Sequence, residues 1–399
     1  MHIVVFNNGV VHAKLRTISF SSYFEKVYYI DIKGIDSPTD FIHTNIQYIN
    51  PFPDNKHMFA DFKIQRMLKH LKPDGIVCHY ASGLGLYSGL LYGKCPVAAI
   101  AMGHDILNDM GDGFIPGYQK YLVRISLRAC DYISAKSFTI KERLEKYGVK
   151  IFVKINFWGT NISTTYQNDK LKSREILELN INDQILLCPR AIEPRLNILL
   201  LIESFSILVD NLPDLKLIIV GRSSKEYIKK VDQFIQMNSL SSRIQIIDEC
   251  ETEILNHYYM ACDVVISIAS SDGFPNCVLE AMSFKRPVIV GNIKQIRELL
   301  VNGENARICE LNKNSIAETI SEVFNNLPHY ENFIVINAYK LVSIVGDIKI
   351  NGRNFANDFI EIIKAWKPSL RQFLKVFLYR IKYSTVFFFR KSGIFKLIH

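Results

Sequence analysis

Short apolar runs rich in β-branched residues alternate, along the first part of the chain, with longer segments of helical spacing. Strands are expected at residues 2–6, 25–32, 75–80, 97–101, 131–135 and 150–155. Strands that are separated by helix-length segments usually pair in parallel and are covered by helices. The pattern therefore predicts a parallel α/β domain.

A polar stretch at residues 159–169 has no apolar periodicity, and a second alternating series follows it. Further strands are expected near residues 185–188, 216–220, 244–247, 264–268 and 287–290. Residues 199–208 have helical spacing, and Asn211-Leu-Pro-Asp214 is expected to end that helix. The sequence thus predicts two α/β domains joined near residues 160–180.

Open parallel sheets bind ligands at the carboxyl ends of their strands. Two facing domains of this kind would offer a cleft between those ends. We therefore expect the functional residues in the loops that follow the strands.

The composition is that of a globular protein, because 48% of the 399 residues are hydrophobic and 22% are charged. The N-terminus lacks the basic and long apolar regions of a secretory signal, so a cytoplasmic protein is expected. No apolar run approaches the roughly 20 residues that span a bilayer. The cysteines are scattered singly, which favours buried free thiols over a zinc site.

Residues 270–282 are the most informative segment, because they lead from an expected strand through a Gly/Pro loop into a helix. If the helix starts near Pro275 or Asn276, its first N–H groups and the positive end of its dipole can bind a diphosphate. Gly273 would allow the backbone to approach that ligand closely.

Four charged residues are expected at the same edge of the second sheet. Asp272 lies in the loop and Glu280 about one turn into the helix, and their acceptor oxygens suit ribose and sugar hydroxyls. Arg190 and Arg195 follow the strand at 185–188, and their guanidinium groups could neutralise a leaving diphosphate. No Asp-x-Asp motif follows a strand, so we predict metal-independent chemistry and no metal site.

Residues 1–365 resemble glycosyltransferase family 4, most strongly over 184–312. The family's Glu-x7-Glu is similar to Asp272 and Glu280, and its Arg-x4-Lys is similar to Arg190 and Arg195. Its Pro-Val-Ile strand resembles residues 287–290, and its following acidic residue resembles Glu298. The chain departs from the family in three places, with Asp for the first Glu, Arg for Lys, and Lys294-Gln295 where many members have Gly-Gly.

The resemblance implies the GT-B fold, in which two Rossmann-like domains face a central cleft. It implies retaining transfer of a hexosyl-type sugar from a UDP- or GDP-sugar substrate, with no cofactor. Asp272, Arg190 and Arg195 would be the catalytic residues. The donor site would comprise Gly273, Phe274, Pro275, Asn276, Glu280 and Glu298.

The resemblance also divides the chain by role. Residues 1–160 would form the acceptor-side domain, 161–345 the nucleotide-sugar domain, and 346–366 a helix that crosses back to the first domain. The acceptor would be a glycan, or a glycan linked to polyprenyl diphosphate. The implied pathway is synthesis of a surface polysaccharide or glycolipid.

The expected acceptor-side residues are Gly9, His104 and Asp105. The segment 102–106 is similar to a family loop, and Asn7-Asn-Gly9 replaces the family's first glycine turn. His104 does not align with the family's usual His, and His79 and His104 could both be structural. The glycine-rich stretch 83–89 could contact a ligand or could permit close helix packing.

Less specific interpretations remain for the same residues. Asp272 and Glu280 could be a turn residue and a solvated helix residue, and the arginines could be surface cations. A second function class is a nucleotide-sugar-binding protein without transfer activity. A third is a sugar epimerase or phosphorylase on the same architecture.

The tail at residues 367–399 has eight Lys or Arg and no acidic residue, within a chain of formal charge +9. Apolar residues recur there at helical spacing: Leu370, Phe373, Leu374, Phe377, Leu378 and Ile381. Such a basic amphipathic stripe predicts peripheral contact with an anionic membrane, expected to be the inner face of the plasma membrane. The alternative is a helix packed on the N-terminal domain. Nucleic acid is not an expected partner, since the apolar stripe has no use along a phosphate backbone.

Overall fold

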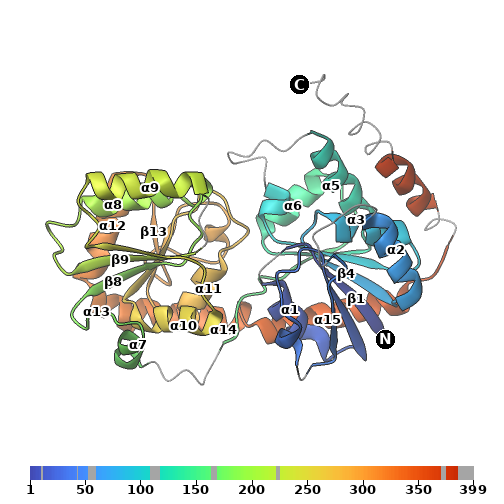
Figure 1. Cartoon of the computed structure of the whole chain (residues 1–399), viewed down its shortest axis with the longest axis horizontal. Coiled ribbons are helices and arrows are strands. Elements are labelled where there is room, and N and C mark those ends of the chain that lie inside the picture. Colours follow the sequence, from blue (N-terminus) through green and yellow to red (C-terminus); the bar gives the residue numbers. More distant parts are fainter. Residues whose placement is uncertain are drawn as a thin grey trace. The chain divides into compact units, whose positions relative to one another are not determined.

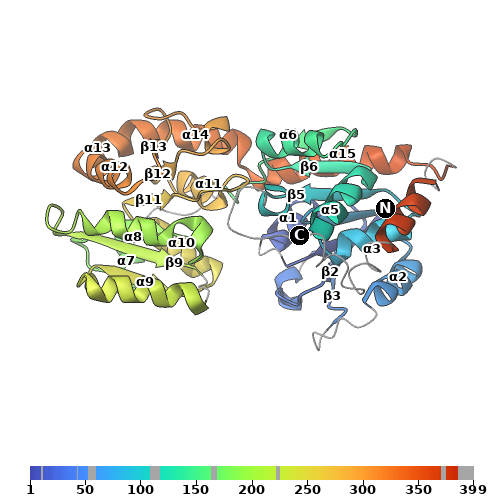
Figure 2. The same ribbon diagram turned by 90° about the horizontal axis from the view of Figure 1, so that it is seen from above.

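The computed structural model describes residues 1–9, 12–42, 44–52, 60–107, 117–162, 169–221, 225–369 and 374–384. These residues form two compact units (Figures 1 and 2). Unit 1 combines the described residues up to Trp158 with those from Ile348 onward, and unit 2 spans residues 159–347. The chain therefore returns to unit 1 after completing unit 2.

Unit 1 is built on a parallel sheet whose strands lie in the order β3-β2-β1-β4-β5-β6-β7. The strands are β1 (His2–Asn7), β2 (Lys26–Asp31), β3 (Ile46–Ile49), β4 (Gly75–His79), β5 (Val97–Ala101), β6 (Tyr132–Ala135) and β7 (Val153–Ile155). The helices are α1 (Ala13–Ser21), η1 (Pro38–Phe41), α2 (Ala60–Leu71), α3 (Leu84–Tyr92), α4 (His104–Leu107), α5 (Gly117–Ala129), α6 (Phe138–Lys146) and α15 (Ile348–Ala365).

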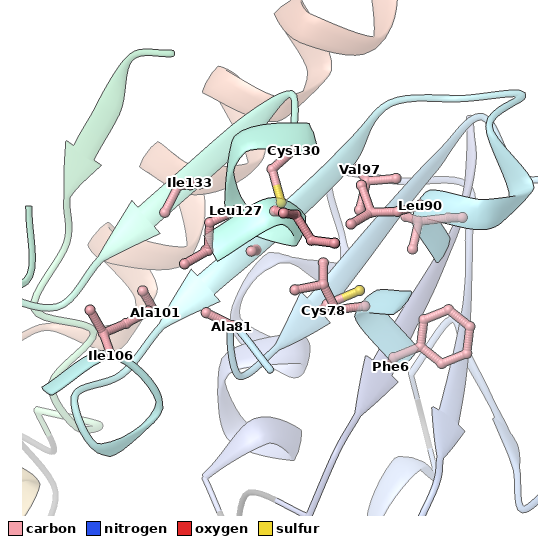
Figure 3. Packing of buried hydrophobic residues seen from close by; sticks show 14 of the residues in the cluster. Phe6, Cys78, Ala81, Leu90, Val97, Ala101, Ile106, Leu127, Cys130 and Ile133 are labelled. Carbon is pink, nitrogen blue, oxygen red and sulfur yellow. The ribbon is translucent and has the colours of Figure 1, made fainter. Parts of the chain in front are cut away.

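Both faces of this sheet are buried. In β1, Val4 and Phe6 enter the core beneath α2, α3, α5 and α6, part of which Figure 3 shows. Ile3 and Val5 enter the opposite core, beneath α1 and α15. Burial on both faces explains why the strands appear in the sequence as continuous apolar runs.

Helix α15 completes unit 1 although it follows unit 2 in the sequence. Phe355 and Phe359 are fully buried against the sheet, and the Tyr132 hydroxyl donates to Asp358 at 3.0 Å. Gly352 faces Ser19 of α1 so closely that a Cβ atom there would overlap it. The absence of a side chain at this position therefore lets the two helices pack.

Residues 374–384 form a further helix in unit 1. The Tyr379 ring is buried and its hydroxyl lies 2.9 Å from Ser126 Oγ, while Tyr383 donates to Asp61 at 2.9 Å. The sequence favours membrane contact over packing for this segment, and the structure shows that one face of the helix packs on the rest of unit 1. The predicted stripe residues Leu370 and Phe373 lie outside the described residues. Within the described part of the chain, no helix is long and apolar enough to cross a membrane.

Unit 2 has a parallel sheet in the order β10-β9-β8-β11-β12-β13. Its strands are β8 (Gln184–Cys188), β9 (Leu215–Val220), β10 (Ile244–Ile247), β11 (Val264–Ser267), β12 (Val288–Gly291) and β13 (Arg307–Cys309). Its helices are α7 (Lys170–Ile176), η3 (Pro194–Leu196), α8 (Ile198–Ser206), α9 (Lys225–Met237), α10 (Thr252–Ala261), α11 (Asn276–Ser283), η4 (Ile296–Glu298), α12 (Lys313–Asn325), α13 (Leu327–His329), η5 (Tyr330–Ile334) and α14 (Val335–Val345). Helices α8, α9 and α12 cover one face, while α10 and α11 lie on the other (Figure 1).

Every strand expected from the sequence is present in the structure, with small differences at the ends. The strands β3 and β13 were not predicted. Both lie at an edge of their sheet and are short, so few of their residues face a core. The cysteines are free and, apart from half-buried Cys250, buried as expected.

Candidate functional site

The predicted donor-site residues of unit 2 follow three strands that are neighbours in the sheet, namely β8, β11 and β12. Parallel strands present their carboxyl ends at one edge, so the loops after these strands lie together there. Arg190 and Arg195 follow β8, Asp272 follows β11, and Glu298 follows β12. The structure therefore brings these residues, which are far apart in the chain, to one edge of the sheet, where the sequence predicts them.

Helix α11 begins at Asn276, as the sequence predicts. Pro275 precedes it in an extended conformation, with φ −66° and ψ 125°. The Gly273 amide donates to the Asp272 carboxylate at 2.7 Å, and the Phe274 ring is fully buried. The tight turn and the buried ring thus fix the loop that leads to the first N–H groups of α11, which form an anion-attracting helix terminus.

Arg190 and Asp272 form an ion pair across this edge. Arg190 Nη2 lies 2.6 Å from Asp272 Oδ2, and the two side chains are only 14% and 16% exposed. Arg190 Nη1 also lies 3.7 Å from the Cys277 sulfur, in the first turn of α11. Burial lowers the pKa of Arg190, but the Asp272 charge and the hydrogen bonds to Asp272 and Cys277 together hold it above its ordinary value.

Arg195 also connects the loop after β8 with the loop after β11, through hydrogen bonds to Ser270 and Ser271. Its Nη1 donates to the Ser271 carbonyl at 3.0 Å, and its own carbonyl accepts from both the amide and the hydroxyl of Ser270 at 3.0 Å. Its Nη2 lies 3.4 Å from Glu193. The guanidinium group is therefore held beside the loop that carries Asp272.

Glu280 lies on α11, beyond the first turn, and is half-buried. The Tyr259 hydroxyl, from α10, donates to Glu280 Oε2 at 2.6 Å. The sequence interpretation did not identify Tyr259, because nothing in its local pattern distinguishes it from the adjacent core residue Tyr258. Only the packing of α10 beside α11 brings the hydroxyl to the carboxylate.

Glu298 ends the short helix η4 after β12 and is half-buried. In the same segment Gln295 is buried and Lys294 is exposed. Lys294 therefore takes the exposed one of the two positions at which many family 4 members have Gly-Gly. The role of Glu298 remains a prediction.

The expected acceptor-side residues belong to unit 1. Gly9 has φ +97°, and its amide donates to Asn7 Oδ1 at 3.0 Å in the turn after β1. Asp105 is buried and accepts backbone N–H bonds from Ala81 at 2.6 Å and Gly103 at 2.8 Å. Asp105 therefore holds together the loops after β4 and β5, which is a structural use of this carboxylate. The side chain of His104 lies outside what the structure describes.

His79 and the glycine-rich stretch 83–89, which the sequence left open between a structural role and a ligand role, both lie in packed surroundings. His79, at the end of β4, is buried, and its Nε2 lies 3.0 Å from Thr17 Oγ1. Gly85 and Gly89 of α3 face Phe6 and Ile76, and a Cβ atom at these glycines would lie 2.5 Å and 3.2 Å from those side chains. Close packing of helix on sheet therefore accounts for these glycines. Among the described residues, no group of three or more His, Cys, Asp or Glu side chains is arranged to hold a metal ion.

Comparisons with known proteins find glycosyltransferases. Residues 169–340 match the family described as glycosyl transferases group 1, and residues 11–137 match the family described as glycosyl transferase 4-like. The chain is 23% identical over 193 residues to the O-antigen chain mannosyltransferase RfbU of Salmonella typhimurium, covering 48% of this chain and 51% of that protein. It is 24% identical over 284 residues to an uncharacterized glycosyltransferase of Haemophilus influenzae, covering 69% and 74%. The first match thus spans about half of the relative's length.

The fold also resembles solved structures. The crystal structure of Anabaena Alr3699/HepE in complex with UDP and glucose superposes with a TM-score of 0.75 at 17% identity, over 90% of this chain and 99% of that one. A likeness at this level of identity concerns the fold.

Proposed function

Because the chain belongs to the group 1, family 4-like glycosyltransferases of the GT-B fold, we propose that it transfers a sugar from a nucleotide-diphosphate donor to a glycan acceptor. The anomeric configuration is retained, and no metal ion takes part. The observation that carries the proposal is the ion pair of Arg190 with Asp272 beside the start of α11. It places a cation, a carboxylate and the N-terminus of a helix at one edge of one sheet.

The proposed chemistry follows from the charges. A departing nucleoside diphosphate gains negative charge, which Arg190, Arg195 and the N-terminus of α11 stabilise without reorganising. The Asp272 carboxylate, held by Arg190, offers oxygens that accept hydrogen bonds from sugar hydroxyls. Two guanidinium groups thus supply the charge for which other enzymes use a divalent ion.

Glu280 binds the ribose of the donor in this proposal, and the backbone of Gly273 and Phe274 faces the sugar. A hexosyl group on UDP or GDP fits the family. The named relatives support that range, since one is called a mannosyltransferase and another protein of this fold was solved with UDP and glucose. The acceptor is a glycan that can be carried on polyprenyl diphosphate, in the synthesis of a surface polysaccharide or glycolipid.

We also propose peripheral contact with an anionic membrane through residues 367–399. The support is the exposed face of the helix at 374–384, where Leu374, Phe377, Leu378 and Ile381 are each 47% to 52% exposed. These positions recur every three or four residues and form one stripe. Of the flanking cations, Lys375 pairs with Asp131 at 2.9 Å, while Arg380 and Lys382 are exposed. The opposite face, with Tyr379, holds the helix on unit 1.

Incubation of the purified chain with a panel of UDP- and GDP-sugars tests the proposed reaction. We expect slow release of nucleoside diphosphate and free sugar from one donor even without acceptor, because water can replace the acceptor. An isomerised nucleotide-sugar would instead identify an epimerase, and turnover that requires inorganic phosphate would identify a phosphorylase. Tight nucleotide binding with no turnover of any donor, with or without glycan acceptors, would identify a binding protein.

A further inference from the structure

Tyr259 connects the helix before β11 with the helix after it. It lies near the end of α10, and its hydroxyl donates to Oε2 of Glu280, on α11, at 2.6 Å. Tyr259 is 1% exposed, so the donor side of this hydrogen bond is shielded from solvent, while Glu280 is half-buried. A short bond to a charged acceptor is among the stronger hydrogen bonds of a protein.

The phenol ring has little freedom to leave this position. It stacks on Phe284, which follows α11, with centroids 5.3 Å apart and ring planes 7° from parallel. The Tyr259 carbonyl accepts from Arg286 Nε at 2.9 Å, and the next carbonyl, that of Met260, accepts from Arg286 Nη2 at 2.8 Å. The ring of Tyr259 and the carbonyl groups of residues 259 and 260 are therefore anchored to the segment that follows α11.

The hydroxyl also keeps its proton. Burial raises the pKa of Tyr259 well above its ordinary value, and the Glu280 charge raises it further. Tyr259 is therefore a permanent donor and Glu280 its acceptor. A carboxylate offers about four acceptor positions, of which the bond from Tyr259 occupies one.

We propose that Tyr259 is a positioning residue that fixes the plane of the Glu280 carboxylate for recognition of the donor ribose. This inference rests on the proposed function, in which Glu280 contacts the ribose hydroxyls. Tyr259 makes no contact with the ligand itself. Its effect is to set the preference for a nucleotide that carries ribose hydroxyls over one that lacks them.

Calorimetric titration of the parent and of Tyr259→Phe tests this role. UDP and GDP are titrated first, and the one that binds more tightly is compared with its 2′,3′-dideoxy form. Phe keeps the ring that stacks on Phe284 and removes only the hydroxyl. Tyr258→Phe is the matched control, because Tyr258 is also buried in α10 but one residue away.

We expect the parent and Tyr258→Phe to prefer the ribonucleotide by at least about tenfold, since a hydrogen bond from a ribose hydroxyl to a charged group contributes at least about that factor in affinity. Tyr259→Phe should lose at least about threefold of that preference through weaker ribonucleotide binding, with dideoxynucleotide affinity unchanged within about twofold. The preference is the ratio of two affinities measured on the same protein preparation. Any unfolded fraction affects both affinities equally and does not change the ratio.

Two results would overturn the positioning role. One is an unchanged preference in Tyr259→Phe, and the other is an equal loss of affinity for both nucleotides, which a general packing defect would cause. A parent protein that binds neither UDP nor GDP, or that binds the dideoxy form equally well, would instead contradict the proposed donor site. The failure of the inference and the failure of the proposed function therefore give different results.

Discussion

Arg190 and Asp272 behave as one unit in the folded protein, because neither charge is well solvated and each is the other's closest ionic partner among the contacts described at this edge. Removal of one partner from a buried pair costs more than the pair contributes, since the remaining charge stays buried. The two residues were assigned separate tasks from the sequence, the diphosphate for Arg190 and the sugar for Asp272. The structure adds that a change at either residue will affect both tasks.

Glu280→Ala and Arg190→Ala should each reduce donor turnover by at least about tenfold, because loss of one hydrogen bond to a charged group costs about 1.5–3 kcal/mol. Steady-state rates of nucleoside diphosphate release measure the effect. Glu318→Ala, an exposed glutamate of α12, is the matched control and should keep the parent rate. Parent-like activity of correctly folded Glu280→Ala would show that the donor site was assigned wrongly.

His79 should make unit 1 sensitive to acid. Thr17 Oγ1 donates to the Ala13 carbonyl at 2.8 Å, so His79 Nε2 must carry the proton that it shares with Thr17. Burial, and then the Arg16 charge, lower the pKa of His79 well below its ordinary value. The unfolded chain binds a proton here below about pH 6.5 while the folded chain does not, so stability is lost as the pH falls.

The free energy of unfolding should fall by about 1.4 kcal/mol per pH unit below about pH 6.5 because of His79. His79→Gln should abolish this part of the pH dependence. Urea unfolding can be followed by tryptophan fluorescence, because both tryptophans of the chain, Trp158 and Trp366, belong to unit 1. His70→Gln changes an exposed histidine of α2 and should leave the slope as in the parent. An equal pH slope in His79→Gln and the parent would contradict the assignment.

The sequence was sufficient to predict which charged residues of the proposed site share one sheet edge, because loops and helices that follow neighbouring parallel strands begin there. The sequence was not sufficient for Tyr259, whose hydroxyl meets Glu280 only through the packing of two helices. Neither periodicity nor motif spacing encodes that contact. The hydrogen bonds from backbone N–H groups to the Asp105 carboxylate could not be predicted either. A carboxylate in a loop has the same sequence pattern whether it binds a ligand or the backbone of its own chain.

Among the elements, α15 ties the end of the chain into the core of unit 1. Phe359→Ala should destabilise unit 1 by about 3–5 kcal/mol, since truncation of a buried Phe removes its packing and leaves a cavity. The same tryptophan signal reports this unfolding, because the ring centroids of Trp158 and of Phe355, on α15, are only 5.3 Å apart. Phe62→Ala, at a 71% exposed position of α2, is the control and should be neutral. A loss below about 1 kcal/mol would mean that α15 contributes little to this core.

The helix at 374–384 should bind membranes through its exposed stripe. Flotation with anionic liposomes should recover the full-length chain at low salt and release it as ionic strength rises, because surface cations near an anionic leaflet contribute about 1 kcal/mol each. A chain ending at Trp366 and the double variant Leu374→Asp/Leu378→Asp should both lose binding. The control Ile207→Asp/Met237→Asp adds the same charge at exposed apolar positions of unit 2.

Neutral liposomes should recover little of any of these proteins. Equal flotation of the full-length chain and the chain ending at Trp366 would remove the tail from membrane contact. Loss of flotation with donor hydrolysis intact would place the tail on the acceptor side of the reaction. Comparison of the full-length chain, the truncated chain and the two double variants therefore distinguishes binding through the apolar stripe from a general effect of added negative charge.

The central strands, whose apolar runs are buried on both faces, were all predicted. Of the short strands at the sheet edges, β7 and β10 were predicted and β3 and β13 were not, because an edge strand gives a weaker apolar signal. For the tail, the spacing of apolar residues was sufficient to predict a helix. The spacing did not indicate which face of that helix would pack on unit 1. Val376, Tyr379 and Tyr383 contact unit 1, so the apolar stripe is left on the other side.

For the whole molecule, the proposed reaction proceeds without a metal ion. Donor turnover should be the same in EDTA as in magnesium or manganese, because Arg190, Arg195 and the start of α11 supply the positive charge. Initial rates across the three conditions measure this. Loss of turnover in EDTA with full recovery on adding either metal would refute it.

One measurement examines the proposed reaction as a whole, namely proton NMR of the sugar first released when the chain hydrolyses its nucleotide-sugar donor. A retaining transferase should release the sugar in the anomeric configuration of the donor, together with nucleoside diphosphate, before the free sugar equilibrates. Glu280→Ala should release it far more slowly. First appearance of the opposite anomer would contradict retention, and an intact donor that only changes into its isomer would contradict glycosyl transfer itself.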